Sequence, residues 1–314
     1  MRAVPPAAVP VPDAAEPLEL DGHAVRVTHP DRVLWPRAGF TKRQLIEYLL
    51  AIAPVLLPHL RCRGITLRRF PEGVDGPGWF QAECRGCPEW MRTFDVTGRG
   101  GRTWRYCMVE SRAGLAWTAN LGTLELHPFL STIDQPTEPT ALVLDLDPGP
   151  PAGLLACARV ALLLRDRLAV LGLEAYAKTS GSVGLHVEVP LAPGHSFEQT
   201  KAFARSLATE LSTSHPTLVT EVIDRTRRAG LVYLDWIQND ASRSTVAPYS
   251  LRATPWPLVS TPLAWHELEA AVAASRPQSL VFTPADVLAR VDRLGDLFTP
   301  LANPTSGGAL PPIR

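Results

Sequence analysis

Two aspartates, Asp145 and Asp147, stand at the end of the apolar run ALVLDLDPG, directly before a Pro-Gly turn. On a β-strand, side chains two positions apart point to the same face, so these carboxylates are expected side by side. Two like charges this close are stable mainly when a divalent cation lies between them. A third acid, Asp235 in LVYLDW, ends a similar apolar run and could complete the ligand set. Three carboxylates that hold two Mg²⁺ or Mn²⁺ ions are an arrangement used for in-line phosphoryl displacement.

The D-x-D spacing alone leaves other interpretations open. An Asp at a strand end often only caps the following turn. Some glycosyltransferases hold a nucleotide-sugar diphosphate through Mn²⁺ at a D-x-D motif, and some phosphatases use the first Asp as a nucleophile. The phosphatase motif usually has Thr or Val two positions after the second Asp, where this chain has Gly149. That position disfavours the phosphatase interpretation.

A run of small residues lies between two predicted strands, in the segment KTSGSVGLH at 178–186. Its backbone N–H groups are open to an anion, and the hydroxyl of Ser180 is a further donor. His186 then begins a strand. The same residues could form an ordinary turn and a structural histidine, and only their occurrence together with DLD and YLDW favours anion binding.

Helices and strands alternate around these motifs, and capping boxes begin two of the helices. Helices are predicted over 41–60 with a kink or break near Pro54, over 154–171 and 196–211, and near 265–274 and 284–294. Strands are predicted over 64–70, 140–146, 184–190 and 230–236. This order indicates an α/β or α+β protein with a mixed sheet, in which 73–107 forms an irregular region.

The two ends of the chain have a different composition. Residues 1–20 are rich in Pro and Ala and are predicted to be a disordered tail, and 301–314 is predicted to be a second loose end. The segment 21–300 between them is predicted to be one domain, with lobes of roughly 21–135 and 136–300.

Charge and cysteine content narrow the class of protein. The formal net charge is zero, so no overall basic charge indicates a nucleic-acid partner. Arginines are clustered within 61–69 and 225–228, where they are either solvated or bind phosphate. Five cysteines, an odd number, argue against a secreted disulfide framework. Neither a signal peptide nor an apolar segment of membrane length is visible, so the cytoplasm is expected and a membrane partner is not.

The pair Cys84-x-x-Cys87 could hold a zinc ion only with two further ligands. Cys62, Cys107 and His59 are the nearby candidates. We expect a plain loop here rather than a zinc site.

Taken together and in this order, LVLDLDPG, KTSGSVGLHVEVPL, RAGLVYLDWIQN and VAPYSLR resemble the polymerase module of bacterial DNA ligase D, a member of the archaeo-eukaryotic primase superfamily. The upstream segments PDRVLWP, LRRFPEGVDG and WTANLGTLELHPFL resemble it as well, so that the similarity extends over roughly 25–270. The resemblance implies a primase-polymerase fold with a mixed central sheet and a smaller, irregular N-terminal lobe. It also implies primer extension with Mn²⁺ or Mg²⁺, a preference for ribonucleotides, and action at gaps and broken ends in non-homologous end joining.

The resemblance also implies roles for individual residues. Asp145, Asp147 and Asp235 would be the catalytic, metal-binding triad. The nucleoside triphosphate, ribo or deoxyribo, would be contacted by Arg68, His127, Ser180, His186, Arg228, Gln238 and Arg252. A downstream 5′-phosphate of the DNA would be bound by His29, Arg32 and Lys42, and Phe80 of the pair Trp79-Phe80 would stack on a template base.

Several cations of the family pattern are changed. Val183 and Ala82 stand where Lys is common, Arg68 also replaces a Lys, and His29 replaces an Asn. We therefore expect weaker nucleotide binding than in relatives that have the lysines. A catalytically weak module that bridges DNA ends, and an Mn²⁺-dependent glycosyltransferase, are the alternatives.

A ligase signature K-x-D-G does not occur, since Lys is found only at positions 42, 178 and 201. The chain is therefore expected not to seal nicks itself. It is expected to be a stand-alone polymerase near the nucleoid that works with Ku and a separate DNA ligase.

Overall fold

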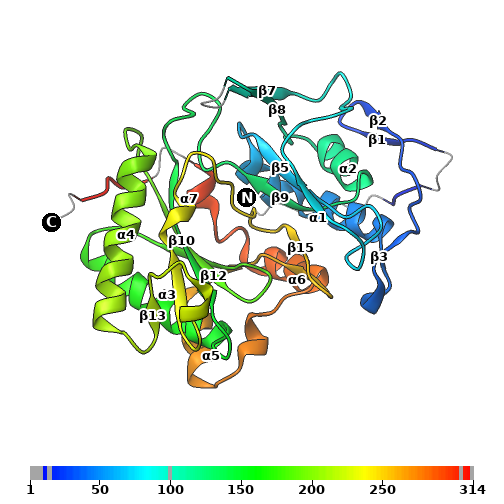
Figure 1. Ribbon diagram of the computed structural model, residues 1–314. Coiled ribbons are helices and arrows are strands. Elements are labelled where there is room, and N and C mark those ends of the chain that lie inside the picture. Colours follow the sequence, from blue (N-terminus) through cyan, green and yellow to red (C-terminus); the bar gives the residue numbers. More distant parts are fainter. Residues whose placement is uncertain (1–9, 13–15, 98–100, 304–306, 312–314) are drawn as a thin grey trace.

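Two large β-sheets form most of the protein, beside three two-stranded sheets, and each large sheet has one apolar face covered by helices and one polar face (Figure 1). The computed structural model describes residues 10–12, 16–97, 101–303 and 307–311. The N-terminal sheet and its helices lie at the right of Figure 1, in blue and cyan, and the second sheet lies at the left, in green and yellow. The fold is the expected mixture of helices and strands with a mixed sheet.

The N-terminal sheet is antiparallel and positions one half of the site. Its strands are β6 (Trp79–Gln81), β5 (Ile65–Arg69), β9 (Thr123–Pro128), β8 (Thr103–Cys107) and β7 (Thr93–Thr97). Leu67 and Leu126 point into a core shared with α1 (Lys42–Leu60) and α2 (Arg112–Asn120). The alternate residues Arg68 and His127 therefore point to the opposite face. The short strands β1 (Leu18–Leu20), β2 (His23–Val25), β3 (Val33–Trp35) and β4 (Phe40–Thr41) precede them.

The second sheet positions the acids. Its six strands lie in the order β13 (Val219–Thr220), β14 (Val232–Asp235), β10 (Ala141–Pro148), β12 (Leu185–Pro190), β11 (Tyr176–Thr179) and β17 (Pro262–Leu263). Only β13 and β14 are parallel. Leu142, Leu144 and Leu146 pack against α3 (Leu154–Val170) and α4 (Phe197–Ser214), and α5 (Trp265–Ala273) joins the same core. Because side chains alternate along β10, Asp145 and Asp147 lie on the face that these helices leave open.

The C-terminal part of the chain returns to the N-terminal lobe. The hairpin of β15 (Leu251–Ala253) and β16 (Pro257–Val259) packs on β9, and α6 (Pro284–Leu294) and α7 (Thr299–Ala302) follow. Tyr48 Oη donates a hydrogen bond to the Tyr249 carbonyl (2.8 Å), and His59 Nε2 lies 2.9 Å from Asp296 Oδ2. Single 3₁₀ turns occupy Pro36–Ala38, Arg225–Arg227, Trp236–Gln238 and Pro277–Leu280.

Three expectations differ from the structure. The helix α1 continues through Pro54 to Leu60, because its buried side chains outweigh the one backbone hydrogen bond that proline removes. The region 73–107, expected to be irregular, contains β6, β7 and β8, whose polar residues alternate with half-buried ones and so give little apolar signal. Leu18–Leu20, placed in the predicted tail, form β1, and Gly308 bridges to Leu191. The helix α7 also runs into the predicted loose C-terminal end, where Leu301 is buried, and residues 1–9, 13–15, 304–306 and 312–314 of the two predicted tails lie outside the described residues.

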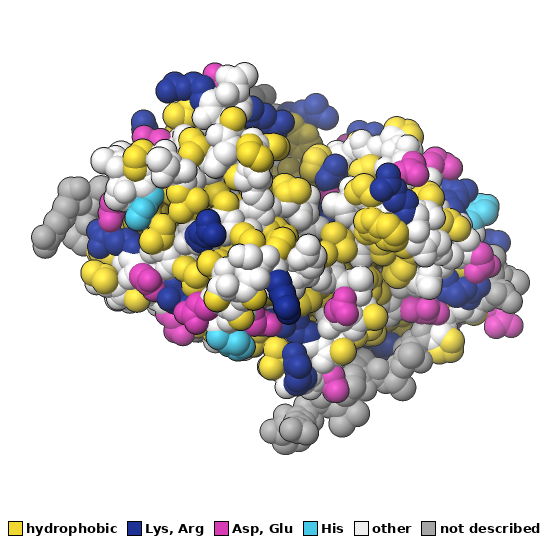
Figure 2. All heavy atoms as spheres, turned by 90° about the horizontal axis from the view of Figure 1, so that it is seen from below, with side chains coloured by type: hydrophobic (Ala, Val, Ile, Leu, Met, Phe, Trp, Pro, Cys, Tyr) yellow, Lys and Arg dark blue, Asp and Glu magenta, His cyan; other side chains and the backbone are white. Residues whose placement is uncertain are grey.

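The surface has no dominant sign of charge on the face drawn in Figure 2, where Lys and Arg alternate with Asp and Glu. This distribution agrees with the zero net charge of the sequence. Among the described residues, none of the helices has both the length and the apolar character needed to span a bilayer.

Candidate active site

Three carboxylates converge on the open face of the second sheet. Asp145 on β10 lies directly opposite Asp235 on β14, and Asp147 follows two residues later on the same face. One carboxylate oxygen from each residue lies within 4.8 Å of the other two. The pairing of β10 with β14 therefore brings together acids that are 90 residues apart in the sequence.

These carboxylates carry charge that the protein does not neutralise. Burial, followed by the charges of Asp147 and Asp235, raises the pKa of Asp145 well above its usual range. Partial burial and the charge of Asp235 raise the pKa of Asp147. Among the described residues, only the neutral His186 lies within ion-pair distance of the three acids, with Nε2 3.4 Å from Asp145 Oδ1. A divalent cation with a preference for oxygen ligands fits this donor set, because it would remove the repulsion.

His186 is held by a buried lysine that the sequence did not indicate. Lys178 on β11 lies opposite His186 on β12 and is fully buried. Its Nζ contacts His186 Nδ1 (3.0 Å), the Val246 carbonyl (3.0 Å) and Ser260 Oγ (3.1 Å). The ammonium uses its three donors in these contacts, so Nδ1 accepts and Nε2 carries the proton toward Asp145. Burial and the charge of Lys178 lower the pKa of His186 to about 4, so that it is a neutral donor at pH 7.

A pocket of about 480 Å³ separates the polar faces of the two sheets. From the N-terminal sheet it is lined by Thr66, Phe80 and His127. From the second sheet and the following loops it is lined by Asp145, Asp147, Ser180, His186, Gln238 and Arg252. The structure thus brings six of the predicted nucleotide and template residues together beside two of the acids.

The loop after β11 is shaped by two glycines. Gly181 has φ +72°, and a Cβ there would lie 2.6–2.8 Å from Arg252 and the backbone of β16 and Ser260. At Gly184 a Cβ would lie 2.3 Å from the Leu146 carbonyl. Ser180 Oγ accepts hydrogen bonds from the backbone N–H groups of Ser182 and Gly184 (3.2 Å each), and its carbonyl accepts from Arg252 Nη1 (3.0 Å). The hydroxyl of Ser180 therefore organises the turn that faces the pocket.

Arg228, a further predicted nucleotide residue, does not line the pocket and acts on the acids through Tyr233. Arg228 donates to the carbonyls of Val222 and Ile223, and its guanidinium lies 3.5 Å from the ring centroid of Tyr233. Tyr233 Oη in turn donates to Asp235 Oδ1 (3.2 Å). Gln238 Nε2, by contrast, is bonded to Thr245 Oγ1 (2.6 Å) at the pocket wall.

Residues 41–298 match the family described as LigD, primase-polymerase domain. The multifunctional non-homologous end joining protein LigD of Mycolicibacterium smegmatis is 39% identical over 280 residues, which is 88% of this chain and 36% of that protein. The bifunctional non-homologous end joining protein LigD of Bacillus subtilis is 28% identical over 276 residues, which is 87% of this chain and 43% of that protein.

A solved structure agrees with these relatives. The polymerase domain of Mycobacterium tuberculosis ligase D, in complex with DNA, superposes with a TM-score of 0.82 at 36% identity and covers 88% of this chain and 98% of that one. The chain belongs to the LigD primase-polymerase family. The family is one of DNA-directed, primase-polymerase nucleotidyltransferases, so the glycosyltransferase and phosphatase interpretations of D-x-D are set aside. The chain spans little more than a third of the length of the mycobacterial LigD proteins it matches.

In this LigD-family chain the aromatic pair is divided between two environments. Phe80 is 60% exposed, lines the pocket and meets His127 edge to face at 5.4 Å. Arg68 lies behind it, with its guanidinium 5.2 Å from the ring centroid of Phe80. Trp79 is also exposed but does not line the pocket, and it lies over Arg69. Of the two rings, only Phe80 can contact a ligand in the pocket.

The three residues expected at a 5′-phosphate lie in the N-terminal lobe and do not line the pocket. Lys42 is buried, and its Nζ donates to the carbonyls of Thr28 (2.7 Å) and Asn120 (3.0 Å). Burial and the charge of Arg32 lower the pKa of Lys42 to about 8. Arg32 donates to the Pro71 carbonyl and pairs with Glu72 (3.1 Å), and His29 is exposed with φ 50°. The cations are therefore adjacent, but Lys42 is largely engaged by the backbone.

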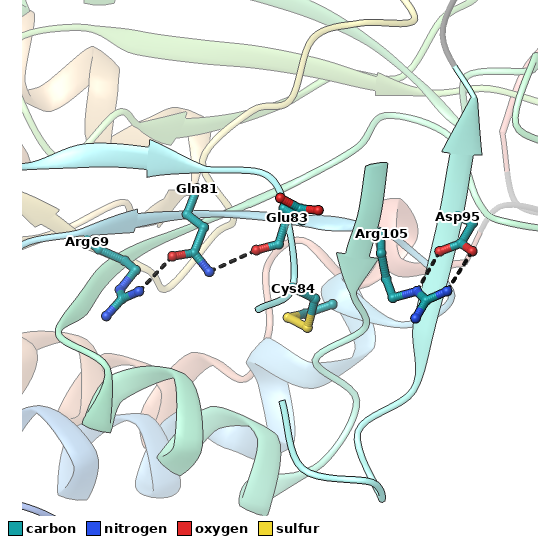
Figure 3. The surroundings of a disulfide bond; sticks show 7 residues. Arg69, Gln81, Glu83, Cys84, Asp95 and Arg105 are labelled. Atoms are coloured by element: carbon teal, nitrogen blue, oxygen red, sulfur yellow. Dashed lines mark hydrogen bonds and ion pairs between the residues drawn. A yellow bond between two sulfur atoms is a disulfide. The ribbon is translucent and has the colours of Figure 1, made fainter. Parts of the chain in front are cut away.

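The segment of Cys84 and Cys87, expected to be a plain loop, is tied down by a disulfide bond. Cys84 is bonded to Cys107 on β8, so these sulfurs cannot be zinc ligands, and no group of cysteines among the described residues could hold a metal (Figure 3). The disulfide fastens the segment after β6, where Arg69, Gln81 and the Glu83 carbonyl form a chain of hydrogen bonds. An odd number of cysteines shows only that not all of them can be paired, and it does not exclude a single disulfide. Cys87 is free.

Proposed function

We propose that this chain is a template-directed nucleotidyltransferase that extends a primer at gaps or broken ends of DNA in non-homologous end joining. The observation that carries the proposal is the convergence of Asp145, Asp147 and Asp235, of which the first two line the pocket between the sheets. Three carboxylates that repel one another at this short distance are suited to hold two Mn²⁺ or Mg²⁺ ions. When bound, such ions would activate the primer 3′-hydroxyl and neutralise charge on the triphosphate.

The residues around the acids are suited to a nucleoside triphosphate. His186 offers a neutral N–H, and Arg252 and the hydroxyl of Ser180 offer further donors on the same side of the pocket, whereas the N–H groups of Ser182 and Gly184 are bonded to Ser180 Oγ. His127 and Gln238 line the remaining walls, with Arg68 and Arg228 behind them. Phe80 would stack on a template base, with Trp79 beside it on β6. We propose a preference for ribonucleotides from the family resemblance alone.

The remaining proposed contacts are with DNA and with other repair proteins. His29, Arg32 and Lys42 would receive the 5′-phosphate downstream of a gap, Lys42 through its position at the first turn of α1. Residues 21–300, with lobes of about 21–135 and 136–300, would act as one unit across the pocket. Ku and a separate DNA ligase would be its partners at the nucleoid in the cytoplasm.

A primer-extension assay tests the proposal. A gapped duplex with a 5′-phosphate is incubated with Mn²⁺ and either ribonucleotides or deoxyribonucleotides, and Asp145→Ala is the control. We expect templated extension by the unsubstituted protein, faster with ribonucleotides, and none by the variant. Absence of extension with both nucleotide sets, or extension that survives Asp145→Ala, would refute the proposed chemistry.

One observation favours a second function. Val183 is 62% exposed at the pocket edge, and Ala82 lines the same pocket, so two positions where relatives often have Lys carry no charge. A module that binds and bridges DNA ends with little turnover would tolerate this loss. It would bind the gapped duplex with a steep dependence on salt and give no extension above the Asp145→Ala level.

A further inference from the structure

Glu125, which has no role among the residues predicted from the sequence, is the most buried carboxylate beside the pocket. Its side chain has no exposed surface, and it lies on β9 two residues before His127 and directly opposite Arg68 on β5. These three side chains therefore share the polar face of the N-terminal sheet. The hairpin of β15 and β16 covers the same face and brings Arg252 next to them.

Both oxygens of Glu125 are occupied. Oε1 accepts from Arg68 Nη1 (2.8 Å) and from the Ala253 backbone N–H (2.9 Å). Oε2 lies 2.8 Å from His127 Nε2 and pairs with Arg252 Nε at 3.3 Å. Three of the seven residues that we assign to the nucleotide thus meet at one carboxylate, which itself does not line the pocket.

The contacts fix which atoms remain for a ligand. Because His127 Nε2 donates to Glu125, Nδ1 is its free ring nitrogen. Arg252 Nη1 donates a hydrogen bond to the Ser180 carbonyl, and Nε lies 3.3 Å from Glu125 Oε2 in an ion pair without a hydrogen bond, so these two contacts hold the guanidinium in place. Arg68 is held at Nη1 and lies over Phe80. Without the carboxylate, two guanidiniums would face each other with no anion between them.

We propose that Glu125 is a positioning residue that aligns Arg68, His127 and Arg252 for the phosphates of a nucleoside triphosphate. The inference rests on the proposed function and goes beyond it, because it assigns a role to a residue that does not touch the substrate. Two arginines and one glutamate leave this cluster with a net positive charge, as an anionic ligand requires.

The substitution Glu125→Gln keeps the shape and removes the charge. Glu267→Gln is the matched control, because Glu267 also binds a buried arginine, Arg290, and neither lines the pocket. Two quantities are measured: the KM for the ribonucleotide in primer extension, and the Kd of a fluorescent ribonucleoside triphosphate with Mn²⁺. We expect both to rise about tenfold for Glu125→Gln, which corresponds to ~1.4 kcal/mol. Affinity for the gapped duplex without nucleotide should change less than about twofold.

A purely structural role gives a different result. In that case a folded Glu125→Gln protein would bind the nucleotide as tightly as Glu267→Gln does, and the inference would be overturned. If Glu125→Gln does not fold, Glu125→Asp keeps the charge but withdraws it by one methylene, and an unchanged Kd for this variant would overturn the inference equally. If the unsubstituted protein does not extend primers, the proposed function fails, whereas the Kd comparison still decides the role of Glu125.

Discussion

Removing the charge of Asp145 should stabilise the protein in the absence of divalent cations. Carboxylate oxygens of Asp145, Asp147 and Asp235 lie within 4.8 Å of one another. At that distance a pair of unit charges repels by about 3.5 kcal/mol at an effective dielectric constant of about 20, and by about 1 kcal/mol in bulk water. Because Asp147 is exposed, its repulsion with each of the other two carboxylates should be closer to the value for bulk water. We therefore expect Asp145→Asn to raise the free energy of unfolding by about 2 kcal/mol in EDTA.

With Mn²⁺, the unsubstituted protein should become more stable than Asp145→Asn. A ligand that binds only the folded state at about 100 times its Kd stabilises that state by about 2.7 kcal/mol. The unsubstituted protein should show a gain of this size, whereas Asp145→Asn has lost one of the three negative charges at the site and should gain much less. Urea unfolding at pH 7.5, in EDTA and in a series of Mn²⁺ concentrations, measures both effects.

Asp296→Asn is the matched control for this experiment. Asp296 is also a largely buried aspartate, but its oxygens are bonded to His59 Nε2 (2.9 Å) and Tyr249 Oη (2.6 Å). The same substitution there removes a paired charge, so it should destabilise the protein and leave the response to Mn²⁺ unchanged. The reasoning is refuted if Asp145→Asn is no more stable than the unsubstituted protein in EDTA, or if Mn²⁺ stabilises the two equally.

Three further outcomes are expected. Val183→Lys should lower the KM for the nucleotide about fivefold or more, because it places a cation at the exposed edge of the pocket. An unchanged KM would contradict the weaker nucleotide binding that we attribute to Val183. Phe80→Ala should weaken templated extension by about 1–3 kcal/mol, whereas Trp79→Ala, outside the pocket, should have a smaller effect in the same assay. Despite burial, the His127 hydrogen bond and the charge of Arg252 lower the pKa of Glu125 to about 2, below its unfolded value of about 4.3, so it stabilises the fold above pH ~4.3 and this is lost as the pH falls toward 2. Between these pH values the free energy of unfolding should therefore fall by up to about 3 kcal/mol less in Glu125→Gln than in the unsubstituted protein. Equal losses of unfolding free energy in the two proteins would contradict the lowered pKa.

The placement of the acids was predictable because it follows from local rules. In β10 the leucines at 142, 144 and 146 alternate with Asp145 and Asp147, and this period of two places the acids on the face opposite the core. The apolar strand that ends at Asp235 gives the same information for β14. The ordered motifs then identified the family, and the comparisons confirmed it.

The predictions that failed concern segments in which tertiary contacts override the local sequence pattern. Pro54 interrupts a helical pattern, but the buried side chains of α1 keep the helix continuous. The strands β7 and β8 are half exposed and polar, so that their sequences resemble loops. The bond between Cys84 and Cys107 depends on β6 and β8 pairing with the same edge of β5, an arrangement that no spacing of cysteines reveals.

Glu125 and Lys178 show a further limit, because the role of each depends on segments far away in the chain. The alternation in ELHPF places Glu125 on the face of His127, but only the hairpin at β15 supplies Arg252. Lys178 looks like the first residue of a turn until Val246 and Ser260 are seen to bind it. The distribution of charge then separates two kinds of carboxylate, one buried behind the pocket wall and the other at the pocket itself. Glu125 is fully partnered and leaves a net positive cluster for an anion, whereas the three aspartates have no cationic partner among the described residues and require one from the ligand.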